Sequence, residues 1–154
     1  MTTSEYASIE REVYIDASPD IVFQVVSAPE HIREWWTSAA DFEPDPGGSG
    51  WLAFGDPEAG GKRVEFSVAD AVPNRLFSFR WDFASGERAV AGNSNLVTFE
   101  LIPEGSGTRL RFTEVGFTDR GWDEAEVKET HVDHTSGWDH FLPKLVRYAQ
   151  GLAA

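Results

Sequence analysis

The chain has 154 residues, of which 41% are hydrophobic and 13% aromatic. This length corresponds to one domain that can bury a core without metals or disulfides. The 26 acidic and 13 basic residues give a formal net charge of −13, which argues against nucleic acids and anionic membrane surfaces as partners. Because there is no cysteine, disulfides, thiolate nucleophiles and cysteine-ligated metals are excluded.

The N-terminal segment is polar and has neither the basic nor the apolar region of a secretory signal. No apolar run approaches the ~20 residues that a membrane span requires. We therefore expect a cytoplasmic protein in which residues 1–7 are flexible and residues 8–154 form a single domain.

The first part of the chain predicts a strand followed by two short helices. Residues 9–16 alternate loosely between apolar and polar side chains, as strands do. Ser18 and Pro19 are typical of a helix N-cap and of the first helical position. Ser27 and Glu30 have the spacing of a capping box, which predicts a second short helix that carries a pair of tryptophans.

The middle of the chain predicts an antiparallel sheet. Residues 41–50 and 56–61 are rich in Gly, Pro and Asp and predict loops. Alternating or short apolar segments predict strands at 51–54, 62–70, 75–83, 95–102 and 108–115. Residues 104–107 would join the last two strands as a hairpin. Strands with one apolar and one polar face favour a sheet that is covered on one side only.

The last segment predicts a long amphipathic helix from Trp138 onward. Its apolar positions recur at helical spacing and are Trp138, Phe141, Leu142, Leu145, Val146 and Ala149. Pro143 lies inside this helix and should remove one backbone hydrogen bond. The order of elements therefore predicts an α+β fold, with one curved antiparallel sheet packed against a C-terminal helix.

Several motifs accompany this order of elements: Ile15-Asp16-Ala17-Ser18-Pro19, Pro29-Glu30 with Trp35-Trp36, Asp45-Pro46-Gly47-Gly48, residues 75–81, Gly107-Thr108-Arg109-Leu110, and Gly137-Trp138 at the start of the last helix. With these motifs, residues 8–152 resemble the START/Bet v 1-like (SRPBCC) superfamily, and within it the homologues of the activator of heat-shock-protein-90 ATPase. The resemblance implies the helix-grip fold, in which a curved antiparallel sheet wraps around a long C-terminal helix and two short helices follow the first strand. Members of the superfamily carry lipids and hormones, cyclise or dehydrate polyketides, or act as co-chaperones, so the fold alone does not assign a function.

Aromatic residues on the inward faces are the candidate ligand contacts. If the alternation holds, Phe66, Phe79, Trp81, Phe99 and Phe112 project from the concave face of the sheet. Trp138 and Phe141 project toward them from the helix, and Trp36 closes one end. These side chains would line a pocket for a small hydrophobic or aromatic ligand, or they would fill a solid core. Because the resembled fold usually keeps a cavity between sheet and helix, we expect the pocket.

Two ionisable residues are candidate polar contacts of such a ligand. Glu114 shares the inward face of Leu110 and Phe112, and a carboxylate there would orient a ligand hydroxyl or act as a base. Its place near a strand end favours instead a carboxylate in water. His134, at the start of the last helix, is the candidate general acid or base because the ordinary pKa of histidine is about 6.5.

His131, Asp133, His134, Asp139 and His140 are crowded in the sequence and suggest a metal site, but they match no metal-binding motif. A solvated helix start is the simpler interpretation. The glycine-rich loops lack the strand–turn–helix context of a phosphate cradle. We therefore expect no metal, no cofactor and no catalytic residue.

A small-molecule binding module is thus the favoured function. An enzyme of the cyclase, dehydratase or hydrolase type, acting on an aromatic or polyketide-like substrate through His134 or Glu114, is the main alternative. A third alternative is a protein-interaction role with a chaperone, as in the co-chaperone relatives. An exposed strand edge and the loop residue Trp51 leave a homodimer open.

Overall fold

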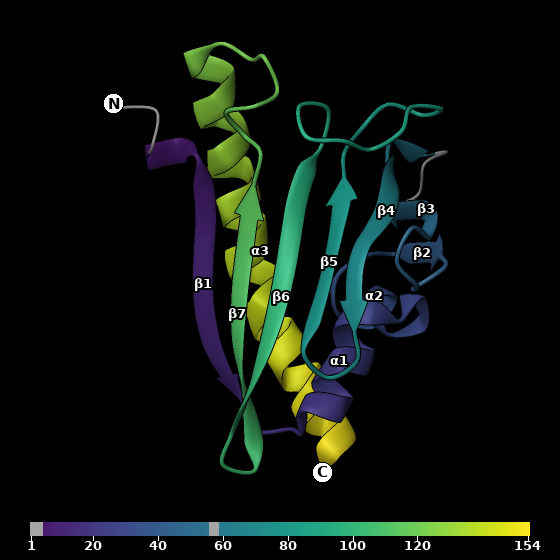
Figure 1. Cartoon of the computed structure of the whole chain (residues 1–154), viewed down its shortest axis with the longest axis vertical. Coiled ribbons are helices and arrows are strands. Elements are labelled where there is room, and N and C mark those ends of the chain that lie inside the picture. Colours follow the sequence, from purple (N-terminus) through teal and green to yellow (C-terminus); the bar gives the residue numbers. More distant parts are fainter. Residues whose placement is uncertain (1–4, 56–58) are drawn as a thin grey trace.

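A computed structural model describes residues 5–55 and 59–154. The elements in chain order are β1 (Ser8–Ile15), α1 (Pro19–Ser27), α2 (Pro29–Trp35), β2 (Ala39–Phe42), β3 (Ser49–Phe54), β4 (Lys62–Val72), β5 (Leu76–Trp81), β6 (Asn95–Glu104), β7 (Gly107–Val115) and α3 (Glu124–Ala153) (Figure 1). The expected order of a strand, two short helices, a run of strands and a long helix is confirmed.

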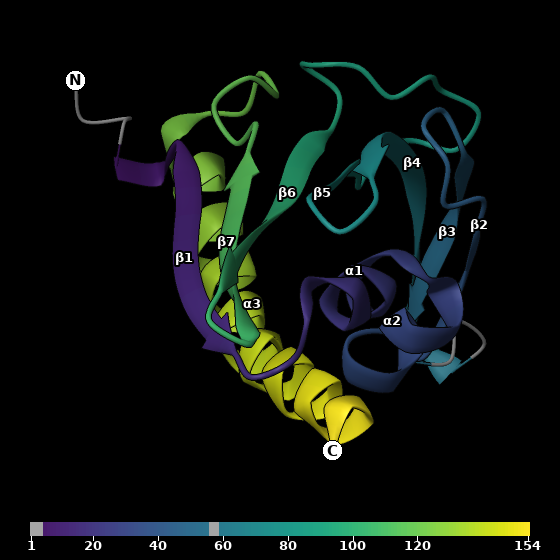
Figure 2. The same cartoon turned by 60° about the horizontal axis from the view of Figure 1, so that its bottom comes forward.

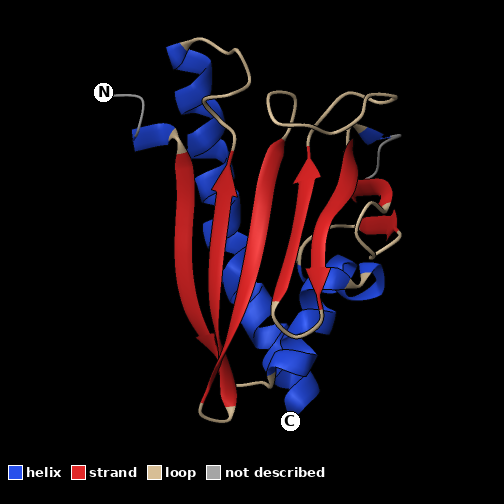
Figure 3. Cartoon of the chain, viewed as in Figure 1, coloured by secondary structure: helices blue, strands red, loops and turns tan. Residues whose placement is uncertain are grey.

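The seven strands form one antiparallel sheet in the order β1-β7-β6-β5-β4-β3-β2. The sheet curves around α3, while α1 and α2 lie beside α3 and close one end (Figure 2). Helices α1, α2 and α3 lie on the same side of the sheet (Figure 3). This arrangement is the helix-grip fold that the sequence predicted. None of the helices in the described part of the chain is both long and apolar enough to span a membrane.

The two faces of the sheet differ as the alternation predicted. In β7 the inward side chains of Thr108, Leu110, Phe112 and Glu114 are buried. The outward face is polar and carries exposed ion pairs between neighbouring strands, such as Arg111 with Glu12 of β1 at 3.3 Å. Exposed pairs of this kind add little to stability, so the fold depends on the concave side.

Helix α3 supplies one side of the core and α1 another. On α3, Leu145 and Ala149 are fully buried, and the apolar stripe predicted for this helix is confirmed. Helix α1 begins at Pro19, and the side chain of Ser18 accepts a hydrogen bond from the backbone of Ile21 at 3.4 Å, as an N-cap does. Trp35 of α2 donates its indole N–H to the Val25 carbonyl at 2.9 Å and thereby joins the two short helices.

Helix α3 begins much earlier than the sequence indicated. It starts at Glu124, where Asp123 is the N-cap and accepts from the backbone of Glu126 at 2.8 Å. The prediction of a start near Trp138 was wrong because the first turns are mostly polar and show no continuous apolar stripe. The helix continues through Pro143.

Two smaller predictions were also wrong. Ser27 does not cap α2: it is the last residue of α1, its hydroxyl donates back to the Phe23 carbonyl, and Ala28 precedes α2 without a capping side chain. The predicted loop at 41–50 contains the end of β2, which pairs with β3 and stacks Phe42 on Phe66, with ring centroids 4.3 Å apart. Residues 1–4 of the expected flexible segment and 56–58 of the expected turn lie outside the described residues.

The packing of α3 predicts a large difference between two truncations on this helix. Leu145→Ala removes a fully buried side chain and should lower the free energy of unfolding by about 2–5 kcal/mol. Val132→Ala, at a position that is 53% exposed, should change it by no more than about 0.5 kcal/mol. Urea denaturation of both variants measures the difference. Equal effects would show that α3 does not pack as described.

Candidate functional site

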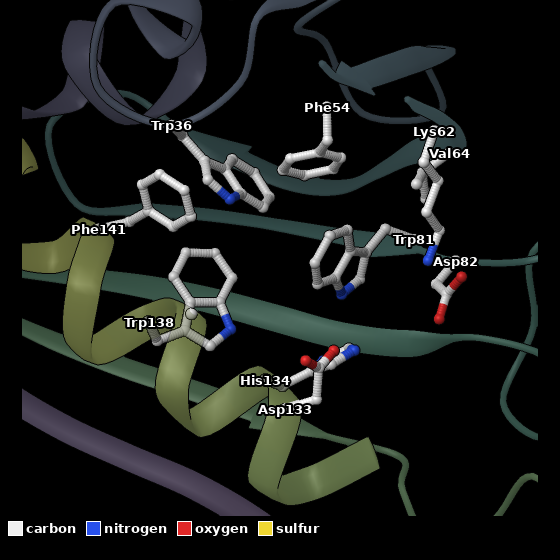
Figure 4. A pocket seen from close by; sticks show the side chains of 11 residues that line it. Trp36, Phe54, Lys62, Val64, Trp81, Asp82, Asp133, His134, Trp138 and Phe141 are labelled. Carbon is white, nitrogen blue, oxygen red and sulfur yellow. The ribbon is translucent and has the colours of Figure 1, made fainter. Parts of the chain in front are cut away.

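A pocket of about 250 Å³ lies between α3, the strands β3 to β5 and the end of α2 (Figure 4). Five of its eleven lining residues are Trp or Phe, namely Trp36, Phe54, Trp81, Trp138 and Phe141. The centroid of Trp36 lies 5.2 Å from that of Trp81 and 4.8 Å from that of Trp138, so three indoles gather around one space. The remaining wall consists of Lys62, Val64, Asp82, Asp133, His134 and Gly137.

The structure divides the predicted ligand contacts, apart from Glu114, into two groups. Trp36, Trp81, His134, Trp138 and Phe141 line the pocket. The four phenylalanines are at most 1% exposed and belong to the packed core; they are Phe66, Phe79, Phe99 and Phe112. The concave face of the sheet is therefore a filled core at its centre and an open pocket toward β3 and β4.

Glu114 lies behind the pocket wall and is fully buried. Its carboxylate accepts hydrogen bonds from the indole N–H groups of Trp81 and Trp138, each at 2.8 Å, and from the amide of Asn95 at 3.1 Å. Nδ1 of His134 is 2.9 Å from the same carboxylate. The expectation that Glu114 lies in water was wrong, because α3 starts before residue 134 and covers this end of β7.

This network compensates for the burial of a carboxylate. An unpaired buried charge is strongly destabilising, whereas hydrogen bonds to an ionised acceptor are stronger than neutral ones. Indole and amide N–H groups can only donate, so Glu114 acts as their acceptor. The donors come from β5, β6 and α3, and the carboxylate therefore joins the helix to the centre of the sheet.

His134 is oriented by this contact. Burial lowers the pKa of His134, but the hydrogen bond and negative charge of Glu114, with the charges of Asp82 and Asp133, outweigh it and raise the pKa above the ordinary 6.5. Because Nδ1 faces Glu114, Nδ1 carries a proton. The other ring nitrogen, Nε2, has no hydrogen-bond partner among residues 5–55 and 59–154, and the side chain lines the pocket.

A second layer of contacts supports the network. Arg120 donates to the side chain of Asn95 at 3.0 Å and to the backbone carbonyl of Asp82 at 2.8 Å. Gly116, at φ +115°, follows β7, and a side chain there would press on Asn95. Sequence reasoning missed Asn95, although it shares the inward face of Val97 and is a polar residue among apolar ones.

The other residues of the crowded acidic and histidine segment point to different partners. His131 bonds the backbone carbonyl of Ser8 at 2.8 Å, and Asp139 pairs with Arg11 at 2.8 Å. In the described part of the chain, no three His, Asp or Glu side chains gather as metal ligands would.

The raised pKa of His134 predicts a pH dependence of stability. The pair with Glu114 contributes fully below the unfolded-state pKa of about 6.5 and loses its contribution as pH rises through the higher folded-state pKa. His134→Asn keeps an N–H near the position of Nδ1 but does not titrate. We therefore expect the difference in unfolding free energy between wild type and His134→Asn, measured by urea denaturation, to fall as the pH rises above about 6.5. A difference that stays constant or grows with pH would contradict this.

Comparisons with solved structures place the chain among proteins of the same fold. The protein MLL2253 from Mesorhizobium loti is 23% identical, the match covers 92% of this chain and 95% of that chain, and the TM-score is 0.73. The Aha1 dimer from Colwellia psychrerythraea is 19% identical over 93% of this chain and 96% of that chain, with a TM-score of 0.72. DynU16, a protein in the dynemicin biosynthetic locus, is 22% identical over 96% of this chain and 48% of that chain, with a TM-score of 0.69.

At these identities the likeness establishes the fold alone. The comparison with curated proteins found no match. The family model described as Activator of Hsp90 ATPase homolog 1-like protein matches residues 16–150, which is most of the chain. The resemblance inferred from the sequence motifs is thereby confirmed, and the chain belongs to the family of Activator of Hsp90 ATPase homolog 1-like proteins.

Proposed function

We propose that the protein binds a small hydrophobic or aromatic compound in the pocket between the sheet and α3. The observation that carries the proposal is a space of about 250 Å³ with five aromatic side chains in its wall. An apolar cavity of about 150 Å³ is enough to hold benzene. The pocket therefore has room for a compound with one or two fused rings.

The pocket also has the polar groups that orient a ligand. Ligand sites are mostly apolar and carry a few convergent polar groups, and here His134, Lys62, Asp82 and Asp133 lie along one part of the wall (Figure 4). A small-molecule ligand is also in keeping with DynU16, a fold neighbour from a biosynthetic locus. This is the ligand class expected from the sequence.

An enzyme is the second candidate, and the pairing of His134 with Glu114 favours it. A histidine whose Nδ1 is held by a carboxylate can exchange a proton at Nε2. However, none of the described residues that line the pocket carries a hydroxyl group. These residues therefore supply no hydroxyl nucleophile, and we favour binding over catalysis.

A second copy of the chain and a chaperone are the candidate protein partners, and neither is needed for the binding of the ligand. The Colwellia psychrerythraea relative is a dimer in its solution structure. In this chain, β1 lies at an edge of the sheet, where another strand could pair with it. Sedimentation analysis would show whether the purified chain associates.

Gly137 allows the pocket to be filled without disturbing the fold. It lies in α3 and lines the pocket, and a Cβ added there meets no atom within 4 Å. Gly137→Leu should therefore fill the cavity and should also favour the helix by roughly 1 kcal/mol. We expect wild type to bind 2-methylnaphthalene, measured by quenching of tryptophan fluorescence, and Gly137→Leu to bind it at least about tenfold more weakly.

Gly151→Leu is the matched control, because Gly151 also lies in α3 with open space around its Cβ but is not among the residues of the pocket. It should bind like wild type. If wild type shows no binding, or if Gly137→Leu binds as tightly as wild type, the proposed function is wrong.

A further inference from the structure

The pocket offers a ligand a ring nitrogen without a hydrogen-bond partner in the described part of the chain, Nε2 of the mostly buried side chain of His134. The side chain of His134 is only 12% exposed, and its Nδ1 lies 2.9 Å and 3.0 Å from the two carboxylate oxygens of Glu114. The indole nitrogens of Trp81 and Trp138 point toward the same place (Figure 4) and are also bonded to Glu114. Glu114 thus accepts from both indoles and from Nδ1 of His134, and Nε2 is left for the ligand.

The contact with Glu114 decides what Nε2 can do. Since the carboxylate holds the Nδ1 proton, a second proton on the imidazole must lie on Nε2. The resulting imidazolium is paired on its inner side and presents a charged N–H donor to the pocket. A donor of this kind prefers an anionic oxygen, because charge-assisted hydrogen bonds are the strongest ones.

Other charged groups also face His134. Asp82 follows β5 and is half-buried, Asp133 precedes His134 on α3 and is exposed, and Lys62 of β4 is exposed at the rim. Arg120 reaches the network only through Asn95. His131 is separated from His134 by the ring of Phe117, whose centroid is 5.1 Å from that of His131 and 5.3 Å from that of His134.

The carboxylates of Asp82 and Asp133, here called the rim carboxylates, and the aromatic wall would by themselves favour a cation. Asp133 and Lys62 are exposed and therefore screened by solvent, and Asp82 is only half-buried. The N–H at Nε2 belongs to a mostly buried side chain and acts on a bound oxygen at hydrogen-bond distance, where screening is weakest. The hydrogen bond from Nε2 to an anionic oxygen should therefore outweigh the attraction of the rim carboxylates for a cation.

We propose, on the basis of the function proposed above, that the pocket selects planar aromatic compounds that carry an anionic oxygen, a carboxylate or phenolate, and that Nε2–H of His134 binds this oxygen. The rings lie among the three indoles, and the oxygen lies at the end of the pocket formed by His134. Glu114 is the positioning residue that holds His134 in this orientation.

Three probes with the same ring system test the selection: 2-naphthoate, 2-methylnaphthalene and 2-naphthylmethylammonium. Calorimetry at pH 6 should show 2-naphthoate binding at least about tenfold more tightly than the other two. Carboxyl groups ionise near pH 4, so 2-naphthoate keeps its charge at higher pH. Its advantage should nevertheless decrease as the pH rises through the raised pKa of His134 and the ring loses the Nε2 proton.

His134→Asn deletes Nε2 while keeping a donor toward Glu114, and it should abolish the advantage of 2-naphthoate over 2-methylnaphthalene, measured as the ratio of their affinities. His140→Asn is the matched control, since His140 is exposed and outside the pocket, and it should behave like wild type. If His134→Asn loses all binding, the pH series of the wild type decides: a loss of naphthoate preference with rising pH supports the proposal, and a constant preference overturns it.

The remaining outcomes separate this inference from the proposed function. If 2-methylnaphthalene binds and 2-naphthoate binds no better, the pocket is a ligand site but His134 does not select the ligand. A preference for 2-naphthylmethylammonium overturns the inference in favour of the rim carboxylates. If none of the three probes binds to wild type, both the inference and the proposed function are wrong.

Discussion

The burial of the Glu114 carboxylate is the constraint on which the site depends. A carboxylate without exposure to water, next to the aromatic core, is stable only if donors surround it. Here β5 supplies Trp81, β6 supplies Asn95, and α3 supplies His134 and Trp138. These elements are distant in sequence, so the carboxylate specifies how the helix is placed against the sheet.

The same contacts also shape the pocket. Trp81 and Trp138 turn their indole nitrogens to Glu114 and leave the rest of their rings to line the space beside Trp36. His134 is held at one nitrogen and lines the pocket with the rest of its ring. Three of the four residues that donate to the buried carboxylate, Trp81, His134 and Trp138, are therefore residues that a ligand would meet, and stability and binding are joined at one place.

The periodicity of the sequence predicted the fold well, because the apolar alternation in the strands and the stripe on α3 both arise from burial on one side. It predicted the pocket only in part. Alternation places Phe79 and Trp81 on the same face but does not tell which of them borders an open space. That difference depends on where the sheet curves and on how α2 positions Trp36 at the pocket.

The network was harder to predict. Glu114 and Asn95 could be assigned to inward faces by parity, yet the apparent helix start near Trp138 left Glu114 uncovered and therefore solvated. The start at Glu124 depends on the cap at Asp123 and on contacts such as that between His131 and the Ser8 carbonyl. Contacts between segments so far apart leave no local pattern in the sequence.

The tautomer of His134 is the most direct test of this account. Nitrogen-15 NMR of the imidazole, recorded above the pKa of His134, distinguishes a protonated Nδ1 from a protonated Nε2. We predict that the neutral ring carries its proton on Nδ1, facing Glu114, and that Nε2 is unprotonated until the pH falls and it gains the second proton. A neutral ring protonated at Nε2 would show that Glu114 does not hold His134, and would contradict both the buried pair and the pocket chemistry built on it.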